Sequence, residues 1–316
     1  MIVVTGGAGF IGSNLVLALA RQGADVLVVD DFSSGSRDNL ANLAVRDCID
    51  GRRFREMLAQ GDSTLDSCER VIHLAARSST RETNRAVVMD VNFEWSRELL
   101  HFCVGRDLPL VYASSAAVYA GLRGYGCAEV LADERPRSLY AQSKWMFDEV
   151  VRKTASGARV VGLRFFNVYG PREAHKGSMA SVVLQFARQL AENQPLRLFR
   201  GSDGFGDGDQ RRDFVHVDDV VSAILWFMNH PEISGIFNVG TGVAATFNAV
   251  AEHVLSFYGA TFKEFVAMPA DVARQYQSST QADLTRLRAC GCDVAFRAVD
   301  VGIAQYLTVL GPEAKA

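Results

Sequence analysis

The chain has 316 residues, of which 48% are hydrophobic and 22% charged, enough for one large α/β domain or for two domains of unequal size. Its formal net charge of -3 at pH 7 excludes the broad positive field that would attract nucleic acid. No apolar run approaches the roughly 18 residues that would span a bilayer, and the first residues, MIVVTGGAGFIG, lack the basic region of a signal peptide. The sequence therefore predicts a cytoplasmic protein without membrane or nucleic-acid partners. Its 6 cysteines show no CxxC spacing, which predicts reduced thiols and no metal site.

Short apolar runs alternate with amphipathic segments in the first half of the chain. Strands are expected at 2–4, 26–30, 70–76, 108–115 and 159–165, and helices at 13–21, 54–58, 92–103 and 138–151. This alternation predicts a parallel sheet with right-handed crossovers and helices on both faces, which is a Rossmann-like doubly wound α/β fold.

Loops lengthen after about residue 167. Helices are expected at 178–193, 218–229, 245–258 and 281–289, and a strand at 235–240. The Gly- and Asp-rich stretch 201–213 is expected to be a mobile flap. We therefore expect a nucleotide-binding domain at 1–167, to which some later segments return, and a smaller mixed α/β substrate-binding domain in most of 168–316.

A glycine-rich turn, TGGAGFIGSNL, directly follows the first strand. Gly6, Gly9 and Gly12 allow a sharp turn, close approach of the backbone to a pyrophosphate, and close packing of the next helix, whose amino end favours an anion. Asp30 ends the second strand about 20 residues later, where a ribose-binding carboxylate is expected. A simple strand-helix turn without a ligand is the alternative interpretation.

The loop after Asp30 leaves the choice of dinucleotide open. Asp30 would accept hydrogen bonds from the adenosine ribose hydroxyls, which favours NAD. Arg37, with serines at 33, 34 and 36, could neutralise a 2′-phosphate, which favours NADP.

Two further segments place acid-base groups near a nicotinamide. YASSAAVY puts Ser115 at the carboxyl end of a buried strand, and SLYAQSKWMFDEVV puts Tyr140 one helical turn before Lys144. A phenol with a pKa near 10 is a poor base, but a neighbouring ammonium and a cationic nicotinamide both favour the phenolate. Such a phenol can remove an alcohol proton while hydride leaves the carbon. A surface tyrosine stacked on a lysine stem is the alternative. His73, at the end of the third predicted strand, is expected to be structural.

Taken together, these motifs resemble the extended short-chain dehydrogenase/reductase family of nucleotide-sugar epimerases and dehydratases, over essentially the whole chain. RFFNVYGPR and RRDFVHVDDV match the family's substrate-domain signatures, and Asn92 matches its structural asparagine. The resemblance implies a tightly bound NADP, with NAD possible. It implies cofactor contacts from Gly6, Gly9, Phe10, Ile11, Gly12, Asp30, Asp31, Arg37, Leu74, Ala75, Ala76, Ser78, Asn92, Lys144 and Val168.

Family members that dehydrate the sugar carry an Asp-Glu pair after the catalytic Ser or Thr. Ala116 and Ala117 occupy those positions here and cannot transfer protons, which disfavours dehydration. HKGSMASV, LFRGSD and the stretch 276–291 resemble the branch of the family that epimerises the nucleotide sugar ADP-heptose for lipopolysaccharide core synthesis. The resemblance also implies that the protein forms a homo-oligomer, and specifically a pentamer. That resemblance implies a catalytic pair of Tyr140 and Lys176, and substrate contacts from Ser115, Asn167, Ser178, Gln185, Phe199, Ser202, Arg212 and Tyr276.

An epimerase of this kind needs a second acid-base group. If hydride returns to the opposite face of the oxidised carbon while the cofactor stays in place, the substrate must turn, and its oxygen then meets different protein groups. Lys176 is the candidate, with a phosphate or ribose contact as its alternative. The guanidinium of Arg212 suits the ADP phosphates, and a surface salt bridge with Asp213 is the alternative interpretation. The rival functions are a UDP-hexose 4-epimerase and a non-catalytic NADP-binding protein.

Overall fold

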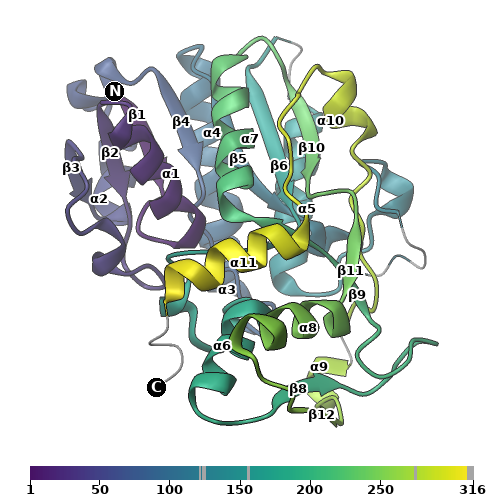
Figure 1. Ribbon diagram of the computed structural model, residues 1–316. Helices are drawn as coiled ribbons and strands as arrows, with labels where there is room; N and C mark the ends of the chain where they lie inside the picture. The colour runs from purple at the N-terminus through teal and green to yellow at the C-terminus, as the bar shows by residue number, and fades with distance from the viewer. Residues whose placement is uncertain (121, 123–125, 155–156, 274–275, 312–316) are drawn as a thin grey trace. The chain divides into compact units, whose positions relative to one another are not determined.

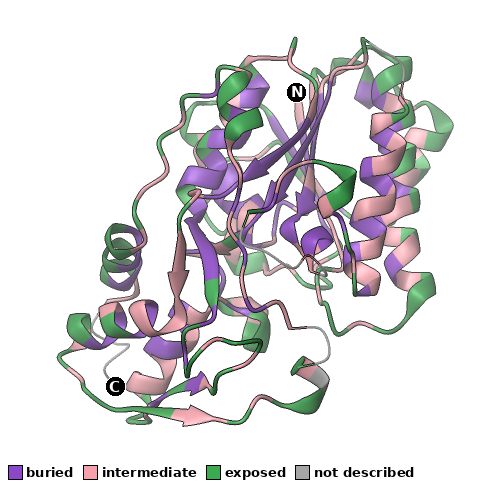
Figure 2. Ribbon diagram, turned by 90° about the vertical axis from the view of Figure 1, so that its right-hand side faces the viewer, coloured by how far each residue is buried: buried purple, intermediate pink, exposed green. Residues whose placement is uncertain are grey.

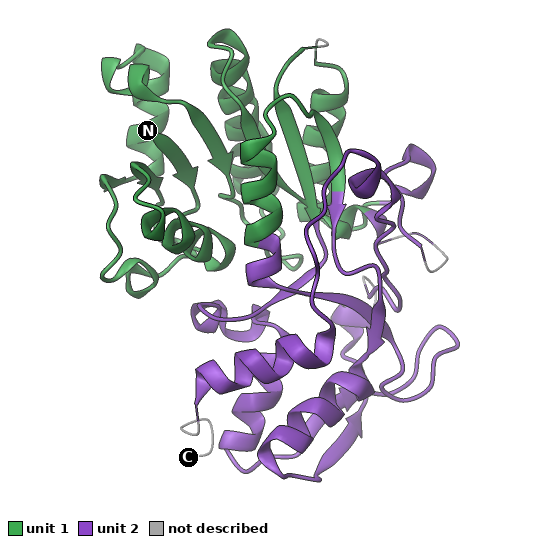
Figure 3. Cartoon of the chain, turned by 45° about the horizontal axis from the view of Figure 1, so that its top comes forward, with its two compact units in different colours: residues 1–118, 136–164, 221–237 green, residues 119–135, 165–220, 238–316 purple. Residues whose placement is uncertain are grey.

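A computed structural model describes residues 1–120, 122, 126–154, 157–273 and 276–311. The chain divides into two compact units (Figure 3): residues 1–118, 136–164 and 221–237 form the first, and residues 119–135, 165–220 and 238–316 the second. The segment 119–135, which precedes the expected boundary at 167, groups with the second unit, and the later segment 221–237 groups with the first.

The first unit is built on a seven-stranded sheet with the order β10-β6-β5-β4-β1-β2-β3. Its strands are β1 (Ile2–Thr5), β2 (Val26–Val29), β3 (Asp47–Ile49), β4 (Arg70–His73), β5 (Leu110–Ser115), β6 (Val160–Phe165) and β10 (Gly235–Val239). The chain winds outward from β1 to β3 and then returns to β4 on the other side of β1, so that the switch point lies between β1 and β4. Both strands pair in parallel with register Thr5 to His73, which confirms the predicted Rossmann-like architecture.

Helices cover both faces of this sheet (Figure 1). They are α1 (Phe10–Arg21), α2 (Gly51–Gln60), α3 (Arg85–Met89), α4 (Trp95–Gly105), α5 (Leu139–Arg152) and α7 (Val217–Asn229). Because β1, β2 and β4 lie between these layers, nearly all of their residues are buried (Figure 2). The sequence shows this as continuous apolar runs without alternation.

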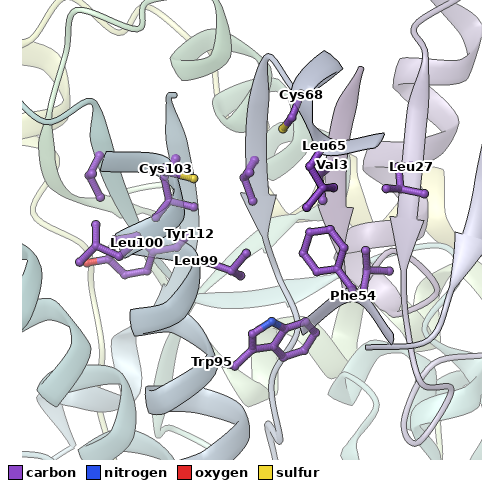
Figure 4. Packing of buried hydrophobic residues seen from close by; sticks show 14 of the residues in the cluster. Val3, Leu27, Phe54, Leu65, Cys68, Trp95, Leu99, Leu100, Cys103 and Tyr112 are labelled. Atoms are coloured by element: carbon purple, nitrogen blue, oxygen red, sulfur yellow. The ribbon is translucent and has the colours of Figure 1, made fainter. Parts of the chain in front are cut away.

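One face of the sheet packs on α2, α4 and α5 through a single hydrophobic cluster. Figure 4 shows Phe54 of α2 beside Val3 and Leu27 of the sheet, with Trp95 of α4 close by. Cys68 and Cys103 belong to the same cluster, and all six cysteines are free thiols, as the sequence predicted.

The predicted helix 92–103 starts earlier and is interrupted. Helix α3 begins after Asn84, whose side chain accepts a hydrogen bond from Val87 N, and it runs into a π-helical turn at Asp90–Glu94 before α4. The π-turn buries Asn92 completely. Widened turns of this kind often occur at functional sites.

The second unit combines two small sheets with helices. A three-stranded sheet has the order β11-β9-β7, and a two-stranded parallel sheet pairs β12 with β8. The strands are β7 (Asn167–Tyr169), β8 (Leu196–Phe199), β9 (Arg211–His216), β11 (Ala244–Thr246) and β12 (Lys263–Val266), and the helices are α6 (Val182–Ala191), α8 (Phe247–Tyr258), α9 (Ala270–Ala273), α10 (Thr285–Ala289) and α11 (Val299–Leu310). A second hydrophobic cluster joins α6, α8 and α11 around Phe186, Val254 and Leu307.

Three predictions for the second unit are wrong at their boundaries. The helix expected at 281–289 begins only at Thr285. The helix expected from Ser178 begins at Val182, because Ser181 caps it and the preceding segment, Ala174–Met179, forms a 3₁₀ turn kinked at Gly177 with φ 54°. Residues 211–213 of the predicted flap belong to strand β9, and Arg212 and Asp213 are buried. In the described part of the chain, no helix combines the length and the apolar character required to cross a membrane.

Candidate active site

Close backbone contacts shape the glycine-rich turn between β1 and α1. Gly6 has φ 68°, and a Cβ there would lie 2.6 Å from the Ala75 nitrogen. A Cβ on Gly12 would lie 2.0 Å from the Gly6 oxygen, so both glycines are required by the fold. A Cβ on Gly9 would meet only the Gly6 oxygen, at 3.2 Å, among the described residues. The partly exposed backbone at Gly9, which carries no side chain, fits a pyrophosphate together with the amino end of α1.

Asp30 lies buried at the end of β2, where its carboxylate accepts hydrogen bonds from Ala8 N at 2.9 Å and Phe32 N at 2.8 Å. The carboxylate thereby ties the glycine-rich turn to the loop after β2. Phe32 has φ 55°, and the Arg37 guanidinium lies 4.0 Å from the centre of its ring. Arg37 is therefore held near the predicted ribose-binding carboxylate.

The other predicted cofactor contacts lie around the switch point. Phe10 and Ile11 open helix α1. Asp31 accepts a hydrogen bond from Ser33 N at 2.9 Å and lies 3.7 Å from an Arg77 nitrogen. The segment with Leu74, Ala75, Ala76 and Ser78 follows β4, where Leu74 N donates to Thr5 O at 3.0 Å.

Asn92 links this segment to helix α5. Its amide oxygen accepts from Arg77 N at 2.7 Å, and its amide nitrogen donates to Arg77 O at 3.1 Å and to Ser143 Oγ at 3.0 Å. The Ser143 hydroxyl in turn donates to Tyr140 O at 2.7 Å. Asn92 thus holds the loop after β4 against the turn of α5 that carries Tyr140, which is a positioning role.

Ser115 and Tyr140 meet at the carboxyl end of β5. Their hydroxyls are hydrogen-bonded, and the Ser115 Oγ also accepts from Ala117 N at 3.1 Å in the 3₁₀ turn Ala116–Tyr119. Lys144 lies one helical turn after Tyr140 and is 2% exposed, so the surface-lysine alternative is excluded. Ser138 begins this helix by accepting a hydrogen bond from Ala141 N at 3.1 Å.

Burial governs the ionisation of this pair. It raises the pKa of Tyr140 above 10, an effect that the Ser115 hydrogen bond opposes and the charge of Asp148 reinforces. It lowers the pKa of Lys144 to about 8, against the charge of Asp148. The expected lowering of the phenol pKa is therefore not produced by the protein groups alone. A cationic nicotinamide would supply it.

Asp148 and Arg164 form a buried ion pair with a separation of 2.6 Å, and both side chains are 0% exposed. The sequence interpretation missed this pair. A signal was present, because Asp148 follows Lys144 by the same four residues that separate Lys144 from Tyr140, and because Arg164 interrupts an apolar strand.

Lys176 belongs to a short loop in the second unit, and Glu173 closes that loop. The Glu173 carboxylate is 0% exposed and accepts from Gly170 N at 3.4 Å at one end and from Ser181 N at 2.6 Å and Ser181 Oγ at 2.5 Å at the other. The Tyr306 hydroxyl of α11 is hydrogen-bonded to the same carboxylate. Lys176 N donates to Glu173 O at 3.0 Å.

Burial lowers the pKa of Lys176, and the charge of Glu173 opposes this shift. Ser178 is exposed in the same loop. Gln185 of α6 donates from Nε2 to Ala180 O at 2.7 Å and to Ser178 O at 3.3 Å, so its amide supports the loop. Glu173 was not singled out from the sequence. Gly170 and Ser181 are near it in the chain, but its partner Tyr306 comes from the distant helix α11.

An arginine-aromatic group forms a second cluster in this unit. The buried Arg212 guanidinium lies 4.8 Å from the ring centre of Tyr276 and 5.6 Å from that of Phe247. Phe199 meets Tyr276 edge to face at 6.0 Å. The predicted substrate residues Phe199, Arg212 and Tyr276 are therefore brought together, with Phe247 as a member that the sequence interpretation missed.

The alternative of a surface salt bridge between Arg212 and Asp213 is wrong. Asp213 is 0% exposed, and its carboxylate accepts from Thr241 N at 2.7 Å, Gly242 N at 2.9 Å and Ala282 N at 3.1 Å. Ser202 is hydrogen-bonded to Ser278 at 3.3 Å, and Asn167 and Val168 open strand β7 beside β9.

His73 is structural, as the sequence predicted. Its ring nitrogens lie 2.7 Å from Thr5 Oγ1 and 2.8 Å from Ser96 Oγ, and burial lowers its pKa to about 3. The ring is therefore neutral at neutral pH and holds β1 against the start of α4. No group of three or more His, Cys, Asp or Glu side chains that could bind a metal ion occurs among the residues that the structure describes.

Comparisons with known proteins extend these observations. Residues 2–240 match the profile of the NAD dependent epimerase/dehydratase family. A protein of Alkalilimnicola ehrlichii named ADP-L-glycero-D-manno-heptose-6-epimerase is 50% identical over 311 residues, which cover 97% of this chain and 96% of that protein.

Two solved structures show the same fold. The ADP-L-glycero-D-manno-heptose-6-epimerase of Helicobacter pylori superposes with a TM-score of 0.83 at 29% identity, over 98% of this chain and 95% of that chain. The UDP-glucose 4-epimerase of Thermus thermophilus in complex with NAD superposes with a TM-score of 0.78 at 28% identity, over 97% of both chains.

Proposed function

Because the chain belongs to the NAD dependent epimerase/dehydratase family, we propose that it inverts C6 of the heptose in ADP-D-glycero-D-manno-heptose to give ADP-L-glycero-D-manno-heptose. The observation that carries this choice of substrate is the 50% identity to the Alkalilimnicola ehrlichii epimerase over almost the full length of both chains. The buried Ser115 and Lys144 side chains and the half-buried Tyr140, hydrogen-bonded to Ser115, support the redox chemistry that the reaction needs.

The proposed cofactor is NADP. Gly9 and the amino end of α1 would face its pyrophosphate, and Asp30 and Arg37 would face its adenosine ribose and 2′-phosphate. When bound, the cofactor accepts hydride from the sugar carbon and returns it. The stacking of Arg37 on Phe32 supports the phosphate role, because it fixes a guanidinium beside the ribose-binding carboxylate.

Tyr140 is the proposed acid-base group of the first unit. Its phenolate removes the proton of the sugar hydroxyl, while the Ser115 hydroxyl donates to the same sugar oxygen. Lys144, protonated in large part at pH 7 with its pKa near 8, favours the phenolate by its charge and binds the nicotinamide ribose. Ala116 and Ala117 carry no acid or base, so elimination of water by that route is disfavoured.

Lys176 is the proposed second acid-base group, for the sugar turned to present its opposite face. Its lowered pKa supports this role, because an amine whose pKa lies closer to neutral pH can both accept and donate a proton at that pH. For the ADP part of the substrate, the buried guanidinium of Arg212 suits the phosphates and the rings of Phe199 and Tyr276 suit the adenine. The remaining proposed substrate contacts are Asn167, Ser178, Gln185 and Ser202.

The decisive experiment offers the purified protein ADP-D-glycero-D-manno-heptose and UDP-galactose in parallel and follows the configuration of the sugar by NMR. We expect conversion of the heptose alone. Tyr140→Phe should slow the conversion by about 10²–10⁴-fold, because the proton acceptor is lost. Tyr258→Phe is the matched control, since its hydroxyl has no hydrogen-bond partner among the described residues. Conversion of UDP-galactose alone would overturn the proposed substrate.

The second acid-base group is tested by Lys176→Met in the same assay. Epimerisation should fall by about 10²-fold or more, while reduction of the bound cofactor in a single turnover persists. Lys153→Met removes a lysine that is 78% exposed and should leave the rate unchanged. Full epimerisation by Lys176→Met would eliminate this role.

The proposed cofactor preference is tested by titrating the protein with NADP and NAD. Arg37→Ala should weaken NADP binding by about 10-fold and leave NAD binding nearly unchanged, because only the 2′-phosphate contact is lost. Equal weakening for both dinucleotides would contradict it. We further propose a cytoplasmic homo-oligomer in lipopolysaccharide core synthesis, with the pentamer expected from the family resemblance, which analytical ultracentrifugation can count.

A further inference from the structure

Helix α5 has a polar buried face. Ser143, Lys144 and Asp148 are 0%, 2% and 0% exposed, although helices normally turn apolar residues toward the sheet. Lys144 and Asp148 are four residues apart, so their side chains are neighbours on the same side of the helix. The helix therefore places a buried amine and a buried carboxylate next to each other, in the two turns that follow Tyr140.

The Asp148 carboxylate is saturated with donors from the sheet. Oδ2 accepts from Arg164 Nε at 2.9 Å, Arg164 Nη2 at 2.6 Å and Ser114 Oγ at 3.0 Å, and Oδ1 accepts from Tyr112 Oη at 2.8 Å. Only an ionised carboxylate accepts from every one of these groups. Strands β5 and β6 thus fix both the position and the negative charge of Asp148.

The other ionisable groups around Lys144 are neutral or positively charged, so Asp148 is the negative charge that acts on it. Tyr140 on α5 and Tyr112 on β5 are neutral phenols whose pKa values burial raises. His73 on β4 is neutral, with its pKa near 3, and Arg164 on β6 is a cation bound to Asp148. Among the described residues, Asp148 is the acid whose charge acts on Lys144.

We propose that Asp148, held by Arg164, is a positioning residue that sets the pH range in which the Tyr140 and Lys144 pair works. This inference rests on the proposed function, in which Tyr140 exchanges the substrate proton while Lys144 is a cation. Asp148 does not touch the reacting atoms and acts through Lys144 and Tyr140.

One negative charge acts on both members of the pair. It raises the pKa of Lys144 against burial, which keeps the ammonium protonated, and it raises the pKa of Tyr140, which delays the phenolate. Removal of the charge should therefore lower both pKa values. A bell-shaped pH profile that depends on a phenolate and an ammonium must then move as a whole toward lower pH.

The test is the pH profile of kcat for Asp148→Asn with the cofactor-loaded enzyme. We expect both limbs to move down by about one pH unit, the size of shift that a neighbouring charge produces. A purely structural role predicts a lower maximum with both limbs in place, and that result would overturn the proposal.

Asp148→Asn removes the negative charge that faces the buried Arg164 and can prevent folding. The double variant Asp148→Asn with Arg164→Gln removes both charges and keeps polar groups in place, and it should show the same downward direction with a smaller shift. Tyr112→Phe is the matched control, because it removes one hydrogen bond from the carboxylate and keeps the charge, so its limbs should stay in place. Wild-type limbs in the double variant would overturn the proposal.

A second measurement is independent of turnover. The Lys144 side chain can be titrated by NMR of its labelled Cε, assigned with Lys144→Arg, in the protein without substrate. Its midpoint should fall in Asp148→Asn or in the double variant and stay in place in Tyr112→Phe. If the protein epimerises no nucleotide sugar, the proposed function fails, whereas an unmoved Lys144 midpoint refutes the role of Asp148.

Discussion

The two units hold their proposed acid-base lysines in different ways. Lys144 projects from a long helix against a buried sheet, and its neighbouring carboxylate, Asp148, forms an ion pair with Arg164. Lys176 lies in a 3₁₀ turn, and its neighbouring carboxylate, Glu173, accepts from amides and hydroxyls of three separate elements. The first lysine is fixed by regular secondary structure and the second by the closure of a loop.

This difference teaches where a single substitution should act. In the first unit, loss of the Asp148 carboxylate removes the negative charge beside a buried cation, Arg164, and threatens the fold. In the second unit, loss of the carboxylate releases neutral donors, some of which can turn to water. The damage there should be smaller and should concentrate on the loop that carries Lys176.

The largest expected effect tests the buried pair. Asp148→Ala should lower the free energy of unfolding by roughly 3–5 kcal/mol, because the buried Arg164 loses its carboxylate partner Asp148. Urea unfolding at pH 7 measures the change. Glu264→Ala is the control, since its ion pair with Arg197 is about half exposed and should contribute less than about 1 kcal/mol. Equal losses for the two variants would remove the distinction between the units.

A second prediction concerns the buried base of the first unit. Unfolded His73 binds a proton below pH 6.5, but the folded ring does so only near pH 3. Stability from this group is therefore complete above pH 6.5 and declines as the pH falls, by about 1.4 kcal/mol per pH unit and about 3 kcal/mol at pH 4.5.

His73→Asn should remove that slope, so its free energy of unfolding between pH 6.5 and 4.5 should fall less steeply than that of the wild type. Urea unfolding at several pH values measures both curves. His101→Asn, at an exposed position of α4, is the control. Parallel curves for the wild type and His73→Asn would show that the ring is protonated in the folded state.

The smallest effect is expected in the loop of Lys176. Glu173→Gln should lower the free energy of unfolding by about 1–3 kcal/mol, because the Ser181 and Gly170 donors lose a charged acceptor. The rate of epimerisation should fall by more than the loss of stability alone explains, because the turn that carries Lys176 becomes less ordered. Ser181→Ala, which removes one donor and a helix cap, should lower stability by about 1 kcal/mol. A Glu173→Gln enzyme with wild-type kcat would show that the Lys176 loop does not need the Glu173 carboxylate for activity.

Local spacing explains which features the sequence could predict. Gly6, Gly12, Tyr140 and Lys144 belong to short motifs whose geometry one strand or helix determines, and the structure brings them to the carboxyl end of the sheet. The contacts of Arg164 with Asp148 and of Glu173 with Tyr306 join separate elements of the tertiary fold, so the sequence shows an arginine that interrupts an apolar strand but does not identify these partners. Strand β9 was not predicted from the sequence for the same reason. Its polar residues are buried by hydrogen bonds and aromatic rings contributed from elsewhere.

The bond from Tyr306 to Glu173 has a consequence for how the protein is made. Helix α11 also packs so closely on β7 that a Cβ on Gly302 would lie 2.0 Å from the Tyr169 hydroxyl. A ribosome that has just finished Lys176 has not yet synthesised either contact. The nascent chain therefore carries an unfinished Lys176 loop until α11 emerges, and the second unit cannot reach its folded form before then.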